Sequence, residues 1–263
     1  MMPRIFKMLA VLAALLAAGC AKAPPRYSFG EEGERTARAQ ALEAWVERQA
    51  ERTATIKALV WLDLSDGEKE RQTEAALLIS RPSSIRVDAM DAIADVWAKA
   101  GSDGHTMWLY LPARDKLYSG RASLANLRRL MKFEWGVSEI IAAVAGLPPM
   151  EANAEILQVG APKEHHFLIR GKNLHLWTDP RTGLPVKCAR YRAEDSALDY
   201  TMSFSEWKRV GGVDFPHRVE TTFPGRGARI VVVYRDAAFG GKVDPQLFAA
   251  PSRVKGKIVE FKE

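Results

Sequence analysis

The sequence predicts a mainly β domain of the α+β class, an open antiparallel half-barrel of about eleven strands wrapped over a helical lid. Apolar residues alternate with polar ones over most of the chain, which is typical of strands that bury one face. Turn residues separate these segments at short intervals, which favours an antiparallel meander. Two short segments of helical periodicity interrupt the strands near the middle of the chain. A sheet of this many strands tends to curl, and its apolar concave face then needs a cover, which the helices supply.

Length and composition are those of an ordinary globular protein. The chain has 263 residues, of which 47% are hydrophobic and 27% are charged, so fibrous and disordered classes are excluded. The formal charge of +6 comes from 38 basic and 32 acidic residues that are scattered along the chain. Nucleic-acid binding proteins usually concentrate such charge in dense basic runs. We therefore expect no nucleic-acid partner, and we expect a monomer.

The first twenty residues have the features of an export signal. Arg4 and Lys7 precede an apolar run over residues 8–18, and Gly19-Cys20 follows. A basic start, an apolar run and small residues predict a signal peptide over residues 1–19. The run is too short to span a bilayer, which takes about 20 residues. An ordinary secretory signal with an incidental cysteine is the alternative.

The end of this signal, residues 16–20, reads LAAGC and resembles the bacterial lipobox. The resemblance implies cleavage before Cys20, a diacylglycerol on its sulfur and an acyl group on its new amine. Stable anchoring in a membrane would follow, because each buried methylene contributes about 0.8 kcal/mol. Since Ala21 is not aspartate, the resemblance favours the periplasmic face of the outer membrane. We expect no cofactor and no metal beyond these covalent lipids.

Acylation of Cys20 would leave Cys188 as the one remaining cysteine, so no intramolecular disulfide is expected. We interpret Cys188 as a small core residue and not as a nucleophile. Residues 20–33, with Pro24-Pro25, are typical of a tether. The folded domain is predicted over residues 34–263.

The folded domain is predicted to begin with an amphipathic helix over residues 34–52, with Leu42, Trp45 and Gln49 on one face. It either covers the sheet, which we favour, or binds a membrane or a partner. Two short helices are expected at 124–131 and 138–145, the second capped by Ser138 and ended by Gly146. Candidate strands are residues 55–64, 71–80, 85–90, 93–100, 105–111, 116–118, 155–159, 165–170, 174–178, 185–191, 200–210, 215–222 and 229–236.

Six segments in order resemble the bacterial lipoprotein-carrier family of LolA and LolB. They are TIKALV at 55–60, SRPSSIRV at 80–87, DGHTMWLY at 103–110, SEII through AGLP at 138–148, GVDFP at 212–216 and VDPQLF at 243–248. Each motif is weak alone, and their ordered combination is moderately specific. The resemblance implies a half-barrel whose apolar cavity receives acyl chains, and the lipobox places the chain beside the membrane-anchored LolB-like member.

This resemblance identifies candidate functional residues. A membrane-insertion loop is expected near residues 89–93, with Met90 and Ile93 as its apolar residues. A LolA-like periplasmic carrier and the acyl chains of lipoproteins or lipids are the candidate partners. The predicted cavity lining consists of the inward apolar residues Ile56, Ala58, Val60, Leu62, Leu77, Ile79, Val87, Met107, Leu109, Ile140, Ile141, Val144, Met202, Phe204, Val231 and Val233.

Two other classes of function are the alternatives to an acyl-chain carrier. An envelope interaction or sensor lipoprotein on the same fold would fill its interior with aromatic side chains and leave no cavity of several hundred Å3. An envelope hydrolase is disfavoured, because the sequence holds no G-x-S-x-G, H-E-x-x-H or Walker motif. His165 and His166 are adjacent on a predicted strand and point to opposite faces, so they are a poor pair of metal ligands.

Overall fold

The computed structural model describes residues 32–131, 135–148, 156–160, 166–170, 173–179, 181–252 and 254–261. The predicted signal peptide, Cys20, the tether up to residue 31 and His165 lie outside the described residues, and of His166 the backbone is described. Three helices are α2 (Glu32–Arg52), α3 (Leu124–Met131) and α4 (Val137–Val144). The described part of the chain contains no helix with the length and apolar character needed to cross a bilayer.

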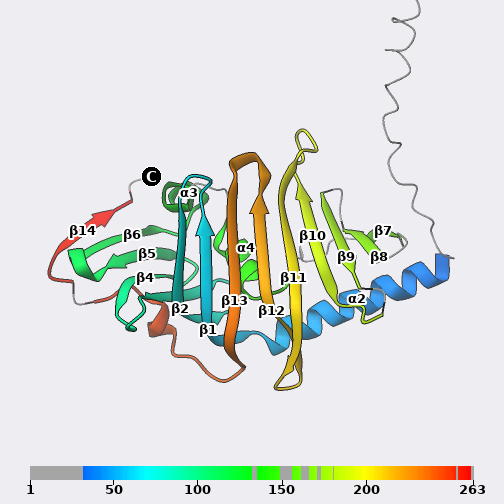
Figure 1. Ribbon diagram of the computed structural model, residues 1–263, viewed down its shortest axis with the longest axis horizontal. Helices are drawn as coiled ribbons and strands as arrows, with labels where there is room; N and C mark the ends of the chain where they lie inside the picture. The colour runs from blue at the N-terminus through cyan, green and yellow to red at the C-terminus, as the bar shows by residue number, and fades with distance from the viewer. Residues whose placement is uncertain are drawn as a thin grey trace, which may run out of the picture.

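One sheet contains all the described strands, in the order β14-β6-β5-β4-β3-β2-β1-β13-β12-β11-β10-β9-β8-β7 (Figure 1). Its two ends are not joined, so the sheet is open as predicted. The strands are β1 (Thr55–Ser65), β2 (Glu70–Ser80), β3 (Ser84–Met90), β4 (Val96–Ser102), β5 (Thr106–Leu111), β6 (Lys116–Arg121), β7 (Ile156–Gly160), β8 (His166–Arg170), β9 (Leu174–Thr178), β10 (Pro185–Tyr191), β11 (Leu198–Val210), β12 (Val213–Phe223), β13 (Ala228–Phe239) and β14 (Lys257–Glu260).

All thirteen candidate segments form strands, which is more than the approximate total of eleven expected, and the strand that was not predicted, β14, pairs with β6 in parallel. All other strand pairs are antiparallel, and β1 joins β13 to unite the two halves of the chain. The segment between β13 and β14 contains the short 3-10 helix η3 (Pro245–Phe248). This 3-10 helix contacts the outer face of the sheet, because Trp108 Nε1 of β5 donates a hydrogen bond to the Phe248 carbonyl over 2.8 Å.

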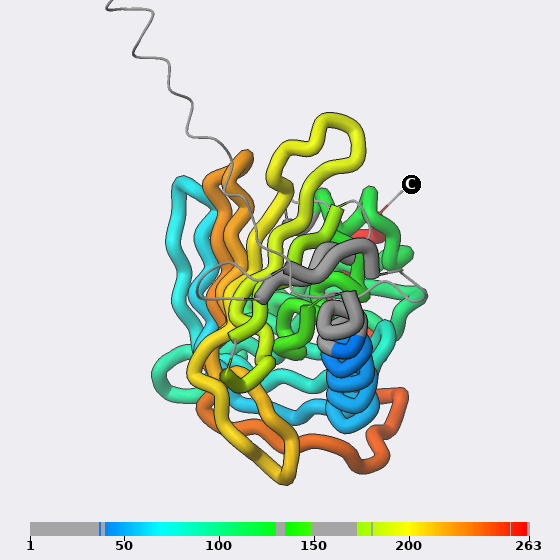
Figure 2. The backbone as a smooth tube through the Cα atoms, turned by 90° about the vertical axis from the view of Figure 1, so that its right-hand side faces the viewer, coloured from blue at the N-terminus to red at the C-terminus, as the bar shows by residue number. Residues whose placement is uncertain are grey.

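Helix α2 packs against β12 and β7, so it covers the sheet as predicted. Trp45 of α2 meets Trp207 of β11 edge to face, with ring centroids 5.9 Å apart. Figure 2 shows the sheet curving around the interior, with β1, β2 and β13 on the side opposite α2 and with α4 between them. Helix α4 therefore occupies the concave face, where it contacts β3 and β12.

The N-terminus of α4 differs from the prediction. Gly136 is the N-cap residue, and its backbone N–H donates to Glu139 Oε2 over 2.7 Å. Ser138 is the second residue of the helix, two positions beyond the N-cap, and its side chain is exposed, so its predicted role as the cap is wrong. The Glu139 carboxylate, at the third helical position, makes the half of a capping box that does not require an N-cap side chain.

The C-terminus of α4 is as predicted. Gly146 has a left-handed φ of +67°, and the Leu147 N–H donates to the Ala142 carbonyl over 3.2 Å, as in a Schellman motif. A Cβ atom on Gly146 would lie 2.6 Å from Pro216 Cγ. Glycine therefore both ends the helix and lets its end approach β12 closely.

Cys188 is fully buried on β10, which agrees with its prediction as a core residue. Burial raises the pKa of its thiol to about 12. Because the thiolate is the reactive form, this cysteine stays an inert thiol near neutral pH.

Candidate functional site

The candidate site is the interior between α4 and the concave face of the sheet. Inward side chains of β1 and β2 form its apolar floor, and the β-branched residues among them suit a pleated, half-buried surface. An apolar cavity of about 40 Å3 lies under α4. Its lining consists of Trp135, Ile140, Ala143, Val144, Val219, Thr221, Ile230 and Val232.

Most of the predicted cavity residues lie on this inner face. They belong to or contact the buried core cluster, and they are Ile56, Ala58, Val60, Leu62, Leu77, Ile79, Val87, Ile140, Ile141, Val144, Met202 and Phe204. Met107 and Leu109 share the face through their register with Ser102 and Ala100 of β4. Among all these residues, only Ile140 and Val144 line the cavity that the structure describes.

The placement of Val231 and Val233 in the interior was wrong. Ile230 and Val232 line the cavity, so the two valines that alternate with them lie on the outer face. Val231 is buried there between its cross-strand neighbours Glu220 and Asp63. Residues 230–233 are an unbroken apolar run, and such a run does not reveal which residues face inward.

The residues that the sequence analysis missed come from α4, the segment before it and the late strands. They are Trp135, Ala143, Val219, Thr221, Ile230 and Val232. The pairing of Phe204 with Val219 would have located Val219, because directly opposed residues share a face. Trp135 precedes α4 and carried no periodicity signal of its own.

Aromatic side chains fill the space beside the cavity. Trp135 lies edge to face with Tyr200 and Phe223, with ring centroids 5.1 and 4.9 Å apart. Phe215 meets Tyr234 and Phe239 at 4.7 and 4.8 Å. Ligand sites usually have volumes of 300 Å3 or more, whereas about 40 Å3 holds one or two water molecules. The cavity that the described residues enclose beneath α4 is therefore too small for an acyl chain in this conformation.

Two tyrosine hydroxyls are buried in this interior. The hydroxyl groups of Tyr200 and Tyr234 have no hydrogen-bond partner among the described residues. Burial raises the pKa of both side chains well above the ordinary value for tyrosine. Both side chains therefore remain neutral, and their hydroxyls are donors without an acceptor.

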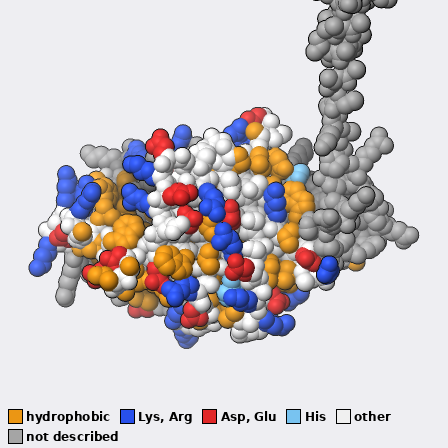
Figure 3. All heavy atoms as spheres, in the orientation of Figure 1, with side chains coloured by type: hydrophobic (Ala, Val, Ile, Leu, Met, Phe, Trp, Pro, Cys, Tyr) orange, Lys and Arg blue, Asp and Glu red, His pale blue; other side chains and the backbone are white. Residues whose placement is uncertain are grey.

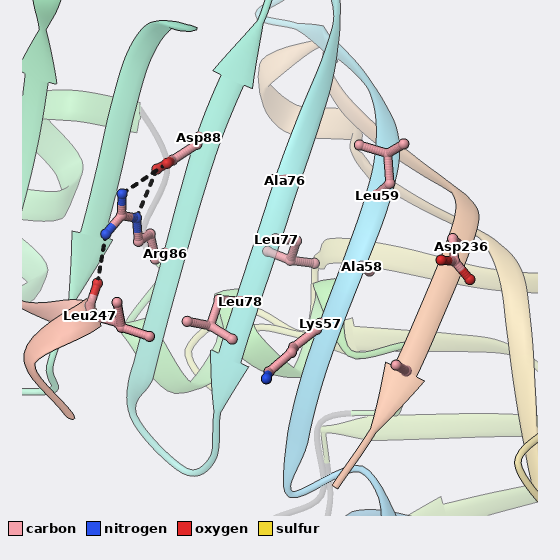
Figure 4. A pocket seen from close by; sticks show the side chains of 11 residues that line it. Lys57, Ala58, Leu59, Ala76, Leu77, Leu78, Arg86, Asp88, Asp236 and Leu247 are labelled. Atoms are coloured by element: carbon pink, nitrogen blue, oxygen red, sulfur yellow. Dashed lines mark hydrogen bonds and ion pairs between the residues drawn. The ribbon is translucent and has the colours of Figure 1, made fainter. Parts of the chain in front are cut away.

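A larger hollow of about 510 Å3 lies on the opposite, outer face of the sheet (Figure 4). Leu59, Ala76 and Leu78 form part of its floor, and Leu247 of η3 overhangs one side. Arg86 connects β3 to η3 at the rim of this hollow. Its guanidinium pairs with Asp88 at 2.9 Å and donates to the Leu247 carbonyl at 3.1 Å. Elsewhere the outer face carries interspersed basic and acidic side chains (Figure 3).

Charged side chains on this outer face form ion pairs across strands. Arg229 Nε is 2.8 Å from Glu220 Oε1, and its Nη1 is 3.3 Å from Asp63 Oδ2. Arg218 adds a second pair with Glu220 at 3.2 Å. These guanidinium groups hold the pKa of Glu220 below its ordinary value. In its described part the outer face is therefore a charged surface, and apolar and charged side chains together line its hollow over β1 to β3.

The predicted insertion loop is a tight turn between β3 and β4. The Asp91 carboxylate accepts hydrogen bonds from the backbone N–H groups of Ile93 and Asp95, each over 3.0 Å. Ile93 lies in this turn with 80% of its side chain exposed. Met90, in contrast, is the last residue of β3, pairs with Glu74 and is half-buried. Met90 therefore belongs to β3 and not to the loop in which the sequence analysis placed it.

A further histidine, His175 of β9, is described with its side chain. Its ring packs against Tyr191 and Trp177, and burial lowers its pKa. No group of three or more potential metal ligands occurs in the described ranges of the chain.

Comparison with known proteins gives structural relatives. No family model and no curated protein matches the sequence. A LolA superfamily protein from Nitrosomonas europaea is similar in structure, with 15% identity, a TM-score of 0.55 and coverage of 81% of this chain and 97% of that one. An outer membrane lipoprotein-sorting protein domain from Vibrio parahaemolyticus has 15% identity, a TM-score of 0.54 and coverage of 83% and 97%.

A third solved structure is a DUF1329 family protein from Desulfovibrio piger, with 12% identity, a TM-score of 0.58 and coverage of 80% and 96%. The alignment covers nearly the whole length of each of these three solved structures. The chain thus has the open half-barrel fold of LolA-like proteins, as predicted.

Proposed function

We propose that this protein is an envelope lipoprotein that binds acyl chains, or the lipoproteins that carry them, against the concave face of its half-barrel. The observation that carries the proposal is the contact between α4 and the sheet. A helix of only eight residues covers the apolar concave face and leaves an apolar cavity beneath it. Displacement of this helix would expose a surface on which acyl chains replace helix side chains, at about 0.8 kcal/mol per buried methylene.

The location follows from the lipobox. Acylation at Cys20 would attach the protein to a membrane, and Ala21 favours the outer one. In this role the protein would help lipoproteins reach the outer membrane, with a LolA-like carrier as donor; the similarity to LolA superfamily and lipoprotein-sorting structures supports the fold that such a role requires. No cofactor other than the covalent lipids enters this proposal.

Binding is tested with the full chain carrying Cys20→Ala and a displaceable fluorescent fatty acid. Val144→Glu places a carboxylate in the cavity, so it should weaken binding at least tenfold, because burying an unpaired charge is costly. The matched control is Ser138→Glu, an exposed position on the same helix. Circular dichroism verifies that both variants fold. Equal affinity of the folded Val144→Glu variant and the control would refute binding beneath α4.

One observation favours the alternative, an interaction module without transfer activity. The larger hollow lies on the outer face, while aromatic rings fill the interior beside α4. Leu78→Glu in that hollow should leave acyl-chain binding unchanged if the carrier function is right. Absence of saturable fatty-acid binding in the folded protein would favour the alternative, whereas binding that is lost in Leu78→Glu and kept in Val144→Glu would place the acyl-chain site on the outer face.

The second part of the proposed function is membrane contact through the β3–β4 turn. Ile93→Glu should reduce transfer of acyl chains or lipoprotein to vesicles and leave the fold intact, because the side chain is exposed. Ala92→Glu is the matched control, since it adds the same charge to an exposed neighbour in the same turn. Transfer is measured by vesicle flotation. Equal transfer by the two variants would rule out a specific insertion of Ile93.

A further inference from the structure

The feature behind this inference is an apolar patch around the hollow on the outer face of β1 and β2. Leu59, Ala76 and Leu78 form part of the floor of this outer patch, and Leu247 of η3 overhangs it (Figure 4). Trp61 follows Leu59 by two residues on β1, so it lies on the same face. The side chains of Trp61 and Leu247 are 46% and 44% exposed. Large apolar side chains therefore meet solvent on the outer face.

The outer patch has a charged rim. The solvated face of an antiparallel sheet is ordinarily polar. Here an apolar centre is bordered by the exposed Lys57 and by two ion pairs, Arg86 with Asp88 and Arg235 with Glu74. An apolar centre within a polar rim is the anatomy of a protein–protein interface, and tryptophan contributes strongly to binding at such interfaces. The outer patch therefore has the composition of a docking surface for a protein.

The arrangement of the outer patch makes it complementary to itself. At its centre, Leu59 lies directly opposite Ala76. Lys57 lies opposite Leu78, two residues to one side, and Trp61 lies two residues to the other side. A two-fold axis that crosses the strands over Leu59, in the plane between two facing sheets, exchanges these two sides. The exposed tryptophan of one copy would then face the hollow of the other copy.

The usual geometry of sheet packing decides where each side chain meets the second copy. Two facing sheets lie about 10 Å apart with their strands crossed at about −30°. This angle moves a position two residues from the axis sideways by about 4 Å, close to one strand spacing. Trp61 of the second copy would thus lie over Leu78 of β2, beside Leu247. Lys57 would move the other way, toward the exposed Asp236 of β13.

We infer that two copies of this chain associate through their outer faces, with Trp61 of each copy in the hollow of the other. The hollow of about 510 Å3 accommodates an indole ring, since pockets of about 300 Å3 already hold whole ligands. Lys57 of each copy would pair with Asp236 of the other copy. The outer patch thus supplies both members of each contact, which is what a two-fold interface requires.

This inference does not depend on the proposed function. Helix α4 contacts β3 and β12 on the concave face, so a dimer through the outer faces leaves both concave faces uncovered. Attachment of Cys20 to a membrane would confine the copies to one surface and raise their effective concentration. The dimer would take the place of the monomer that we expected from the sequence.

Sedimentation equilibrium of the full chain carrying Cys20→Ala measures this association without the covalent lipids. The expected result is a reversible equilibrium of monomer and dimer with no larger species, because a two-fold interface closes on itself. Trp61→Ala should weaken dimerisation at least about tenfold, since each dimer loses two buried rings. The matched control is Trp97→Ala, a tryptophan that is 40% exposed and whose indole donates to Thr73. It should leave dimerisation unchanged.

An exchange of charges tests how the two copies are arranged. Lys57→Glu and Asp236→Lys should each weaken self-association about tenfold, because like charges then face each other at two places in the dimer. A mixture of these two variants should associate as the parent chain does, since each variant supplies the charges that the other lacks. Circular dichroism verifies that both variants fold. Recovery in the mixture can come only from contact between copies.

Three results would overturn the inference. A monomer at every protein concentration would leave the hollow to a different protein or to an acyl chain. Dimerisation that Trp61→Ala does not weaken would place the interface elsewhere on the chain. Dimerisation that depends on Trp61 but does not recover in the mixture of charge variants would disprove the two-fold arrangement. The acyl-chain binding assay with Val144→Glu remains a separate test of the proposed function.

Discussion

Replacement of Phe215 by alanine should lower the free energy of unfolding by about 3–5 kcal/mol, the usual cost of removing a large buried ring. Phe215 is 1% exposed and packs between the rings of Tyr234 and Phe239. Its ring also lies near Gly146 at the end of α4. The lost ring would leave a cavity where the helix meets the sheet, and neighbouring strands restrict how far this site can collapse.

Urea unfolding followed by tryptophan fluorescence measures this change. Ile93→Ala is the control, because it truncates an exposed apolar side chain and should alter the free energy of unfolding by no more than about 0.5 kcal/mol. A loss below about 1 kcal/mol in Phe215→Ala would contradict the packing described between α4 and β12.

The second large effect has the opposite sign. Tyr234→Phe should raise the free energy of unfolding by about 1–3 kcal/mol, the desolvation cost of a polar group buried without a partner. Tyr234 is 3% exposed, and its hydroxyl has no partner among the described residues. The phenylalanine ring would keep the contact with Phe215 and remove only the oxygen.

Tyr110→Phe is the matched control for this change. The Tyr110 hydroxyl donates to Asp115 Oδ1 over 3.0 Å, so the same substitution there should lower stability by about 1 kcal/mol. Both variants are compared by urea unfolding. Destabilisation by Tyr234→Phe would indicate that its hydroxyl has an acceptor, such as a bound water or a ligand group.

These two effects bear on the proposed opening of the interior. Tight aromatic packing at Phe215 favours the closed state, while unpaired hydroxyls at Tyr200 and Tyr234 weaken it. A lid over a lipid site needs this balance, because a ligand shifts an equilibrium only between states of similar free energy.

Local signals in the sequence predicted individual elements well. Alternation over residues 55–64 and 71–80 predicted the two strands of the β1–β2 hairpin, and Gly67 in the turn between them has a positive φ. Gly146 marked the end of α4 for the same reason of backbone conformation. Helix α2 begins within two residues of its predicted start.

Signals that depend on a distant neighbour were weaker. The run at 230–233 left the two faces of β13 undecided until pairing with β1 and β12 assigned them. β14 has only four residues, so it carries little periodicity. Its strand conformation depends on parallel pairing with the edge strand β6. The sequence analysis placed Met90 in a loop, because periodicity does not reveal that Met90 pairs with Glu74 of β2.

By itself, the sequence determined the fold class, most strand positions and most of the inward apolar residues, because periodicity and turn chemistry are local properties. Only the tertiary structure decided how full the interior is, which valines face outward and which buried polar groups lack partners. Those properties depend on distances between segments far apart in the chain. Tyr200 and Tyr234 illustrate this, since neither stands out in the sequence, and their hydroxyls become informative because they are buried with no partner among the described residues.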